Sequence, residues 1–249
     1  MRKLFAISGL LFLSALTICL AEAGLGAKEP NLPVSQGNPA AASPAWTDGE
    51  TLHFKLLWPS SLSLGEATLT VSPANDQMRF ELRVDAALPT HDFSASISSL
   101  ATRQNLCSLQ YEQKVIEGVK TSNETIQFDQ NAHQAHRTRA GQTDTFPTPP
   151  CARDPLAFFY YFRAQIAAGA PLNAQSFFMG PSQAVDLRRS GNDSVSAGGK
   201  QYSTERYEMT YRNPKTAKTF QVWMSTDARR APVRIQLPFP LAIFSAELQ

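Results

Sequence analysis

The segment 151–171, CARDPLAFFYYFRAQIAAGAP, constrains the fold most, because it carries strong helix signals and has almost no polar side. Asp154 is a good N-cap residue, and Pro155 takes the first helical position, where a missing N–H costs nothing. Gly169 supplies a C-terminal stop signal, so we predict a helix from Pro155 to Ala168. A helix that is apolar all round is buried on most sides. The rest of the chain must therefore wrap around it.

Two interpretations of this helix are open. The favoured one is a core helix covered by a sheet, and the other is that some of its aromatic rings line an apolar cavity. In the second case the candidate ligand contacts are Phe158, Phe159, Tyr161, Phe162 and Arg163. A buried guanidinium needs an acidic partner or an anion. For Arg163 we favour an internal ion pair with a strand carboxylate over a ligand contact.

Spacings of three and four residues place one set of side chains close to a common helix face: Leu156, Phe159, Phe162, Arg163 and Ile166. We expect the helix to pack on the concave face of a sheet and to form one wall of any apolar site. The expected sheet contacts lie on predicted strands: Leu69, Phe80, Leu82, Val84, Val222 and Met224.

Most of the remaining chain alternates apolar and polar residues with the period of a β-strand. Residues 78–88 are the clearest case, with one dry and one wet face, as is typical of an antiparallel sheet. About a dozen such segments and one good helix, without α/β alternation, predict a mostly β protein. We expect a large curved antiparallel sheet or an open β-barrel with the aromatic-rich helix packed on its concave face, since a sheet of that many strands tends to curl or close.

Three segments are less regular. Residues 93–106 have some helical spacing, but their Ser and Thr content favours a strand. Residues 144–150 are proline-rich and are predicted to form a loop that leads into the helix. Gly191–Asp193 has the composition of a strong turn.

The N-terminal residues have the features of a secretory signal. Arg2 and Lys3 form a positive region, an apolar run follows, and Ala21–Ala23 is an A-x-A cleavage site. A membrane anchor is the alternative, but the early position and the small-residue site favour cleavage. Lipidation of Cys19 is not expected, because the residue before it is not small.

These features predict three parts: a signal peptide at 1–23 that is cleaved after Ala23, a flexible Pro/Ala/Gly-rich leader at 24–47, and a single β-rich domain at 48–249. We expect a periplasmic protein with no transmembrane segment after cleavage. Cys107 and Cys151 are the cysteines left in the mature chain, and an even pair in an oxidising compartment predicts a disulfide. Two separate buried thiols are the alternative.

Charge and motifs exclude several classes of partner. Removal of the signal peptide leaves 21 of 23 basic and 20 of 21 acidic residues, because Arg2, Lys3 and Glu22 are lost. This balance gives no electrostatic footprint for nucleic acid. His133 and His136 would point to opposite faces of a strand, so we expect no metal site. No catalytic motif and no cofactor motif is present, and we assign no catalytic residue.

Five stretches in order resemble the bacterial exported family DUF3108: Gly49–Leu52, Gly65–Leu69, Asp154–Arg163, Val222–Asp227 and Arg230–Pro232. The resemblance implies an envelope protein with a mostly β, curved-sheet or open-barrel domain. It implies no activity and no catalytic residues.

The chain departs from the family pattern in two places. One is the Ser/Ala-rich segment Phe93–Ala101, and the other is the pair of Cys107 and Cys151. The resemblance therefore bears on fold and location more than on function.

The sequence is compatible with three functions. The leading one is an exported cell-envelope protein, not an enzyme, that binds or carries lipid or another apolar or amphipathic envelope molecule. The second is a structural or assembly factor that binds another envelope protein through a sheet edge. The third is a hydrolase whose site the sequence does not reveal. The first predicts a deep apolar pocket, and the second predicts a filled interior with an exposed strand edge.

Overall fold

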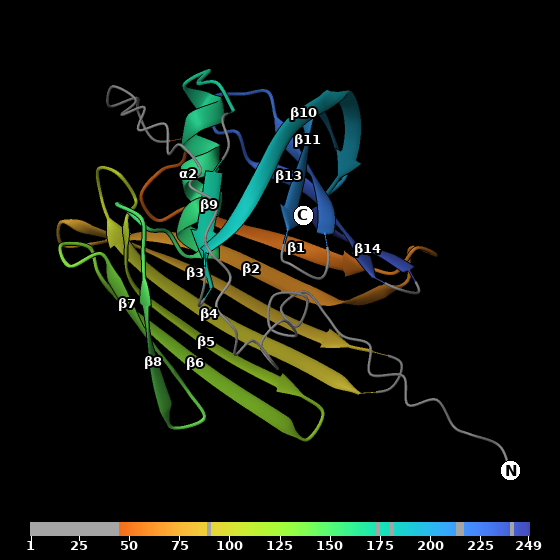
Figure 1. The fold of residues 1–249 in the computed structure, drawn as a ribbon. Coiled ribbons are helices and arrows are strands. Elements are labelled where there is room, and N and C mark those ends of the chain that lie inside the picture. The colour runs from red at the N-terminus through yellow and green to blue at the C-terminus, as the bar shows by residue number, and fades with distance from the viewer. Residues whose placement is uncertain (1–44, 89–90, 173–174, 180–181, 213–216, 240–241) are drawn as a thin grey trace, which may run out of the picture.

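The computed structural model describes residues 45–88, 91–172, 175–179, 182–212, 217–239 and 242–249. They form one sheet of 14 strands and one helix, α2 (Pro155–Ala167) (Figure 1). The strands are β1 (Thr51–Leu57), β2 (Ser63–Ala74), β3 (Gln77–Ala87), β4 (Asp92–Thr102), β5 (Ser108–Glu117), β6 (Lys120–Asp129), β7 (Gln134–Arg139), β8 (Gln142–Pro147), β9 (Gln175–Phe178), β10 (Ser182–Ala197), β11 (Lys200–Arg212), β12 (Ala217–Ser225), β13 (Pro232–Phe239) and β14 (Ala242–Leu248).

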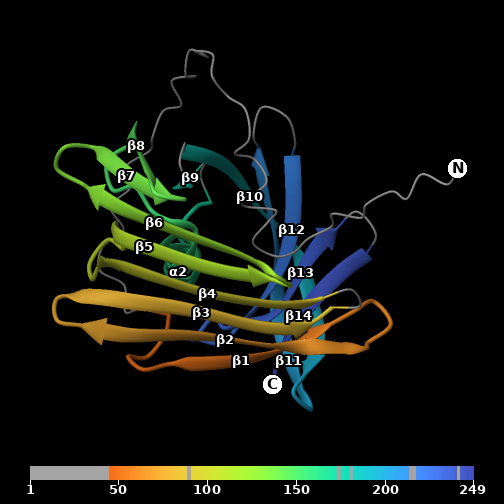
Figure 2. The same ribbon diagram turned by 90° about the horizontal axis from the view of Figure 1, so that it is seen from below.

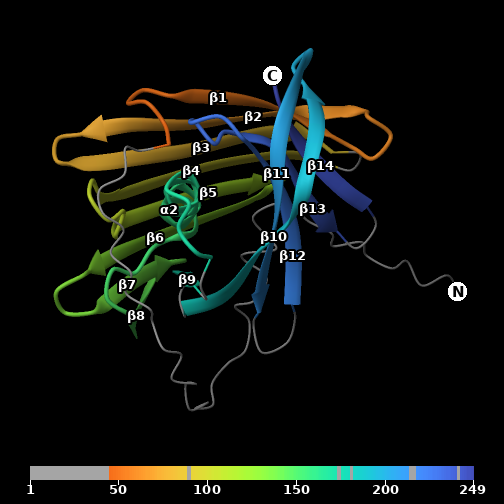
Figure 3. The same ribbon diagram turned by 90° about the horizontal axis from the view of Figure 1, so that it is seen from above.

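All the strand pairs are antiparallel, and the sheet bends into two wings. The first wing is β1 to β8, the second is β9 to β14, and β1 pairs with β14 where they meet. Figure 2 shows the strands of the two wings crossing at a steep angle. Helix α2 lies in the hollow between them, against β3, β4 and β9 (Figure 3). The predicted fold class, a large curved antiparallel sheet with one aromatic-rich helix on its concave face, is confirmed.

The sheet does not close through hydrogen bonds. In the described part of the chain, β8 pairs only with β7 and β9 pairs only with β10. Aromatic side chains bridge these two edges instead. The ring of Phe178 on β9 lies 5.5 Å from the ring of Phe128 and 6.0 Å from the ring of Phe146, both in edge-to-face arrangements. The result is an open barrel whose seam is packed rather than hydrogen-bonded.

The start of α2 is fixed by a capping network and a disulfide. The carboxylate of Asp154 accepts hydrogen bonds from the N–H groups of Leu156 and Ala157, as the sequence predicted. Its other oxygen accepts the hydroxyls of two buried serines at 2.6 Å, Ser99 and Ser108.

The predicted disulfide is confirmed, because Cys107 and Cys151 are bonded and their Cα atoms lie 4.6 Å apart. It ties the segment before α2 to the segment before β5. At the other end, α2 stops at Ala167, one residue before the predicted end, and Gly169 has a φ of 65°.

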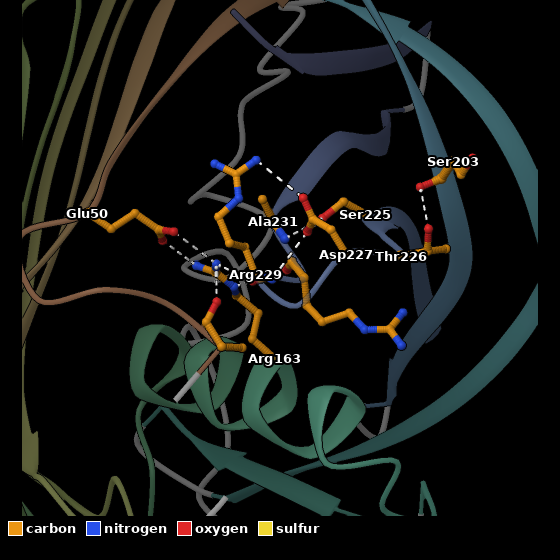
Figure 4. Close-up of polar contacts among 10 residues, drawn as sticks. Glu50, Arg163, Ser203, Ser225, Thr226, Asp227, Arg229 and Ala231 are labelled. Carbon is orange, nitrogen blue, oxygen red and sulfur yellow. Dashed lines mark hydrogen bonds and ion pairs between the residues drawn. The ribbon is translucent and has the colours of Figure 1, made fainter. Parts of the chain in front are cut away.

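A buried guanidinium closes one end of the barrel, which we call the Arg163 end (Figure 4). Arg163 is 0% exposed, and its Nη1 lies 2.7 Å from Oε1 of Glu50, immediately before β1. Its remaining N–H groups donate to the carbonyls of Arg229 and Arg230 in the β12–β13 turn and to that of Ala45. The favoured interpretation of Arg163 as one half of an internal ion pair is therefore confirmed.

The predicted boundary of the flexible leader needs a correction. Its residues Ala45 and Trp46 belong to the core, and the indole of Trp46 packs edge-on against the rings of Phe80 and Tyr160. The folded part therefore begins before Asp48. The predicted signal peptide, the cleavage site after Ala23 and leader residues 24–44 lie outside the described residues.

Two local predictions were wrong, and a third was right. Residues 144–150 were predicted as a loop, but β8 occupies most of them, and Pro147 is tolerated because it ends an edge strand. The predicted turn at Gly191–Asp193 lies inside β10, where the register with β11 shifts between Arg189 and Gly191. The glycine marks a β-bulge there. Residues 93–106 form a strand as predicted, β4, up to Thr102.

Replacing Arg163 with Met should lower the free energy of unfolding by about 3–5 kcal/mol, because it leaves the largely buried carboxylate of Glu50 without its partner. Urea unfolding of the wild type and the variant measures this loss. The control is Arg103→Met, because the Arg103–Asp48 ion pair, at 2.8 Å, is roughly half exposed on both sides. That change should cost less than about 1 kcal/mol. Equal losses in the two variants would contradict a structural role for the buried pair.

Candidate functional site

An apolar cavity of about 220 Å³ lies between the N-terminal half of α2 and both wings of the sheet. Several strands run the length of the barrel, and only the half of each strand that is distant from Arg163 lines the cavity. On β1 the lining residues are Phe54 and Leu56 but not Leu52, and on β12 they are Lys218, Thr219, Phe220 and Val222 but not Met224. We call this half of the barrel the cavity end. The cavity therefore lies at one end of the fold, and α2 runs from it toward the Arg163 end.

Helix α2 contributes its first turns to the cavity. Two of the five sequence-predicted ligand contacts, Phe158 and Phe159, line it, together with Pro155 and Leu156. Phe159 is only half-buried, since its ring meets the open space of the cavity.

The other three candidates lie elsewhere. Phe162 is 0% exposed and packs edge-on against Tyr207, with ring centres 5.2 Å apart. The ring of Tyr161 lies under the guanidinium of Arg153 at 3.6 Å, and Arg163 is held at its own end of the barrel. The helical spacing that groups Phe159 with Phe162 and Arg163 is real, but the last two lie one turn further along the axis, beyond the cavity.

The predicted sheet contacts divide in the same way. Leu69, Leu82, Val84 and Val222 line the cavity. Phe80 instead stacks on Tyr160 of the helix, with ring centres 4.2 Å apart, and Met224 is fully buried beyond the cavity. The four cavity-lining residues form part of its wall, whereas Phe80 and Met224 fill the core toward the Arg163 end.

Some inward-facing side chains remain partly accessible. Leu82, Phe220 and Ile235 line the cavity and are only half-buried, although Val84 and Val222 on the same faces are buried. Inward residues of a filled core would be buried throughout. The cavity is partly open rather than fully enclosed, so it is connected to solvent.

The lining carries very few polar groups. Among the described residues that line it, the side chains with polar atoms are Tyr111, Tyr211, Lys218 and Thr219. Tyr111 donates its hydroxyl to Oε1 of Gln113 at 2.7 Å, and burial raises the pKa of Tyr111 well above its usual value. This phenol therefore stays protonated at neutral pH. No carboxylate, imidazole, thiol or serine is part of this described lining.

In the described part of the chain, two buried carboxyl groups with shifted pKa values, those of Asp154 and Glu124, lie outside the cavity lining. Burial raises the pKa of Asp154, while hydrogen bonds from Ser108 and Ser99 work in the opposite direction. Each oxygen of the Asp154 carboxylate already accepts two hydrogen bonds, one oxygen from the helix N–H groups and the other from the two serine hydroxyls. Burial likewise raises the pKa of Glu124, an inward residue of β6, near Arg137 on β7. Sequence reasoning missed this buried pair of charges, although the strand alternation of β6 and β7 could have revealed it.

The histidines that raised the metal question do not meet. His133 lies in the β6–β7 turn with a φ of 52°, while Nδ1 of His136 lies 2.9 Å from the hydroxyl of Thr145. Within the described ranges, no group of three or more His, Cys, Asp or Glu side chains is placed to hold a metal ion.

Comparisons with known proteins identify a family and a fold. The sequence profile of the family described as "Protein of unknown function (DUF3108)" matches residues 51–249. No curated protein matches the sequence significantly. Among solved structures, a beta-barrel-like protein of the domain of unknown function DUF1849 from Brucella abortus superposes with a TM-score of 0.58 at 8% identity, over 80% of this chain and 94% of that one.

Two further matches are weaker. One is a candidate lipoprotein from Parabacteroides distasonis, with a TM-score of 0.33 at 10% identity, over 81% of this chain and 94% of that one. The other is a candidate exported protein with a YmcC-like fold from Bacteroides fragilis, with a TM-score of 0.31 at 10% identity and the same coverage. At such identities only the likeness to the Brucella protein is informative, and it concerns the fold alone.

The position of the cavity predicts that two aromatic residues of α2 contribute unequally to stability. Phe162→Ala should lower the free energy of unfolding by about 3–5 kcal/mol, because Phe162 is enclosed on all sides. Phe159→Ala should cost clearly less, because that ring already faces open space and loses fewer contacts. Urea unfolding of both variants measures the difference. An equal or larger loss for Phe159→Ala would mean that its ring is tightly packed and that the cavity is not open in solution.

Proposed function

The chain belongs to the DUF3108 family, and we propose that it is an exported, periplasmic protein of the cell envelope that binds or carries an apolar or amphipathic molecule. The observation that carries this proposal is the solvent-connected apolar cavity of about 220 Å³ between α2 and the two wings. Ligand sites are concave and mainly apolar, with a few polar groups that fix orientation. The cavity has this composition.

The volume of the cavity limits the size of the ligand that it can enclose. An apolar cavity of about 150 Å³ stays dry and accepts benzene, so in proportion 220 Å³ encloses roughly nine carbon atoms. This is room for part of one hydrocarbon chain or one small ring system. A lipid with several acyl chains would have to leave most of its apolar surface outside. The cavity therefore favours a molecule with a single apolar chain.

The lining favours binding over catalysis. General acid–base or nucleophilic catalysis needs groups such as His, a carboxylate, Ser or Cys within reach of the substrate. The described cavity lining offers two phenols, one threonine and one lysine. We therefore propose a binding role without chemical turnover.

Two features support the envelope location. The N-terminus combines Arg2 and Lys3, an apolar run and the Ala21–Ala23 site. The disulfide between Cys107 and Cys151 suits an oxidising compartment. In the described part of the chain, no helix has the length and hydrophobicity needed to cross a membrane.

A second candidate function rests on the edge strand β8. Its residues are nearly all exposed, and in the described structure it pairs only with β7. A free edge of this kind can accept a strand from another protein. Four of the six residues of β8 are polar, however, and the interior is hollow rather than filled, so we rank binding in the cavity first.

A fluorescent fatty acid should bind the mature wild-type protein with an increase in emission, because its chain enters an apolar space. Leu82→Trp should abolish this binding, since the larger ring fills the cavity from a half-buried position on β3. Leu62→Trp is the matched control, because Leu62 is 61% exposed in the β1–β2 turn, and it should bind as the wild type does. No binding by the folded wild type would reject the carrier role.

The mature protein recovered from the periplasm should begin at Gly24, because cleavage is expected after Ala23. N-terminal sequencing and intact mass measure the start. Ala23→Arg should block processing and leave the precursor in the membrane fraction. A mature protein that begins at Met1, or one that stays in the cytoplasm, would contradict the proposed location.

A further inference from the structure

We propose that the molecule bound in the cavity carries a negatively charged head group, which Lys218 contacts at the cavity mouth. The ligand class is thus a single-chain amphipathic anion, such as a fatty acid. This inference rests on the proposed binding function and specifies its ligand.

The first step is the direction of the lysine side chain. Successive residues of a strand point to opposite faces. Lys218 has the same parity on β12 as Phe220 and Val222, and all three line the cavity. Lys218 therefore lies on the inner face of the barrel, although a lysine at a strand end usually faces water.

The second step is its depth. The β11–β12 ladder ends at the pair Arg212 and Ala217, and the next pair is Tyr211 with Lys218. A strand rises about 3.3 Å per residue, so Phe220 and Val222 lie roughly 7 and 13 Å further in. Among the described residues, Lys218 thus belongs to the outermost row of the cavity wall. Its position is suited to a head group at the mouth whose chain points inward.

The third step is charge. Among the described residues that line the cavity, Lys218 is the one with a charged side chain, and it is half-buried. A lysine can lay its methylene stem on apolar surface and keep its ammonium near water. Lys218 also has an interaction within the protein. An ammonium has three donors, so it can hold that interaction and still donate to a carboxylate, sulfate or phosphate oxygen.

The alternative is that Lys218 has a structural role at the end of β12 and does not contact a ligand. It predicts that head-group charge has no effect on binding. The two alternatives are separated by three ligands with the same twelve-carbon chain, namely dodecanoic acid, dodecanol and dodecylamine, each used to displace the fluorescent probe from the mature protein at low salt. The wild type should bind the acid roughly tenfold more tightly than the alcohol, as expected for one charge-assisted contact near water.

Lys218→Gln should remove the preference, so that the acid and the alcohol bind this variant about equally. The matched control is Lys55→Gln, because Lys55 lies on β1 between the cavity residues Phe54 and Leu56 but is exposed on the outer face. This control should keep the wild-type preference. Lys218→Glu should shift the preference toward the amine.

Salt gives a test that needs no variant. Raising the ionic strength should weaken binding of the acid to the wild type and leave the alcohol unaffected, because screening acts on the charged contact alone. This arm decides the question even where a Lys218 variant fails to fold, as judged by thermal melting.

The outcomes separate the inference from the function on which it rests. If acid and alcohol bind equally, or if Lys218→Gln keeps the preference for the acid, the head-group assignment is wrong while the carrier function stands. A preference for the amine also overturns it. If none of the three ligands displaces the probe and the probe itself does not bind, the carrier function fails as well.

Discussion

The arrangement of the molecule depends on one buried charge. Arg163 connects the helix to Glu50 before β1, to Ala45 further upstream, and to the carbonyls of Arg229 and Arg230. Removing a guanidinium from water is costly unless nearly all its donors are satisfied. The N-terminal segment, the β12–β13 turn and α2 must therefore come together at one point. Because β1 belongs to the first wing and the β12–β13 turn to the second, Arg163 ties the two wings to the helix, in addition to the direct pairing of β1 with β14.

The cavity follows from this arrangement of the helix and the wings. A sheet that closed through hydrogen bonds would fill its interior with strand side chains, but here a helix of about 10–12 Å diameter stands between the wings. Tyr160 and Phe162 fill the space beside α2 toward the Arg163 end, and both are 0% exposed. Toward the cavity end the helix presents Phe158 and Phe159, and the wings are too far apart for these rings to fill the gap. The same helix therefore packs one half of the barrel and leaves the other half hollow.

Local physics explains which features the sequence could predict. The capping residue Asp154 and the alternation of β3 act over a few residues, and both were predicted correctly. The turn expected at Gly191 failed because a β-bulge and a turn share the same glycine signal, and only pairing with β11 decides between them. The separation of Phe159 from Phe162 could not be predicted, because it depends on where the wings diverge. Lys218 did carry a usable signal, since the alternation of β12 places it beside Phe220, but the sequence does not say that this face encloses a cavity.

The route to the cavity can be argued from what holds the helix. At its start, Asp154 is bonded to Ser99 and Ser108, and the disulfide of Cys151 lies just before it. Near its end, Arg163 is fixed by an ion pair and three carbonyls. A helix held at both ends cannot swing out as a lid without breaking buried polar contacts, and the seam beside it is packed by Phe178. Among the described residues, this leaves the strand ends at the cavity end, beside Lys218, as the route for the proposed ligand, with its head group reaching the protein last.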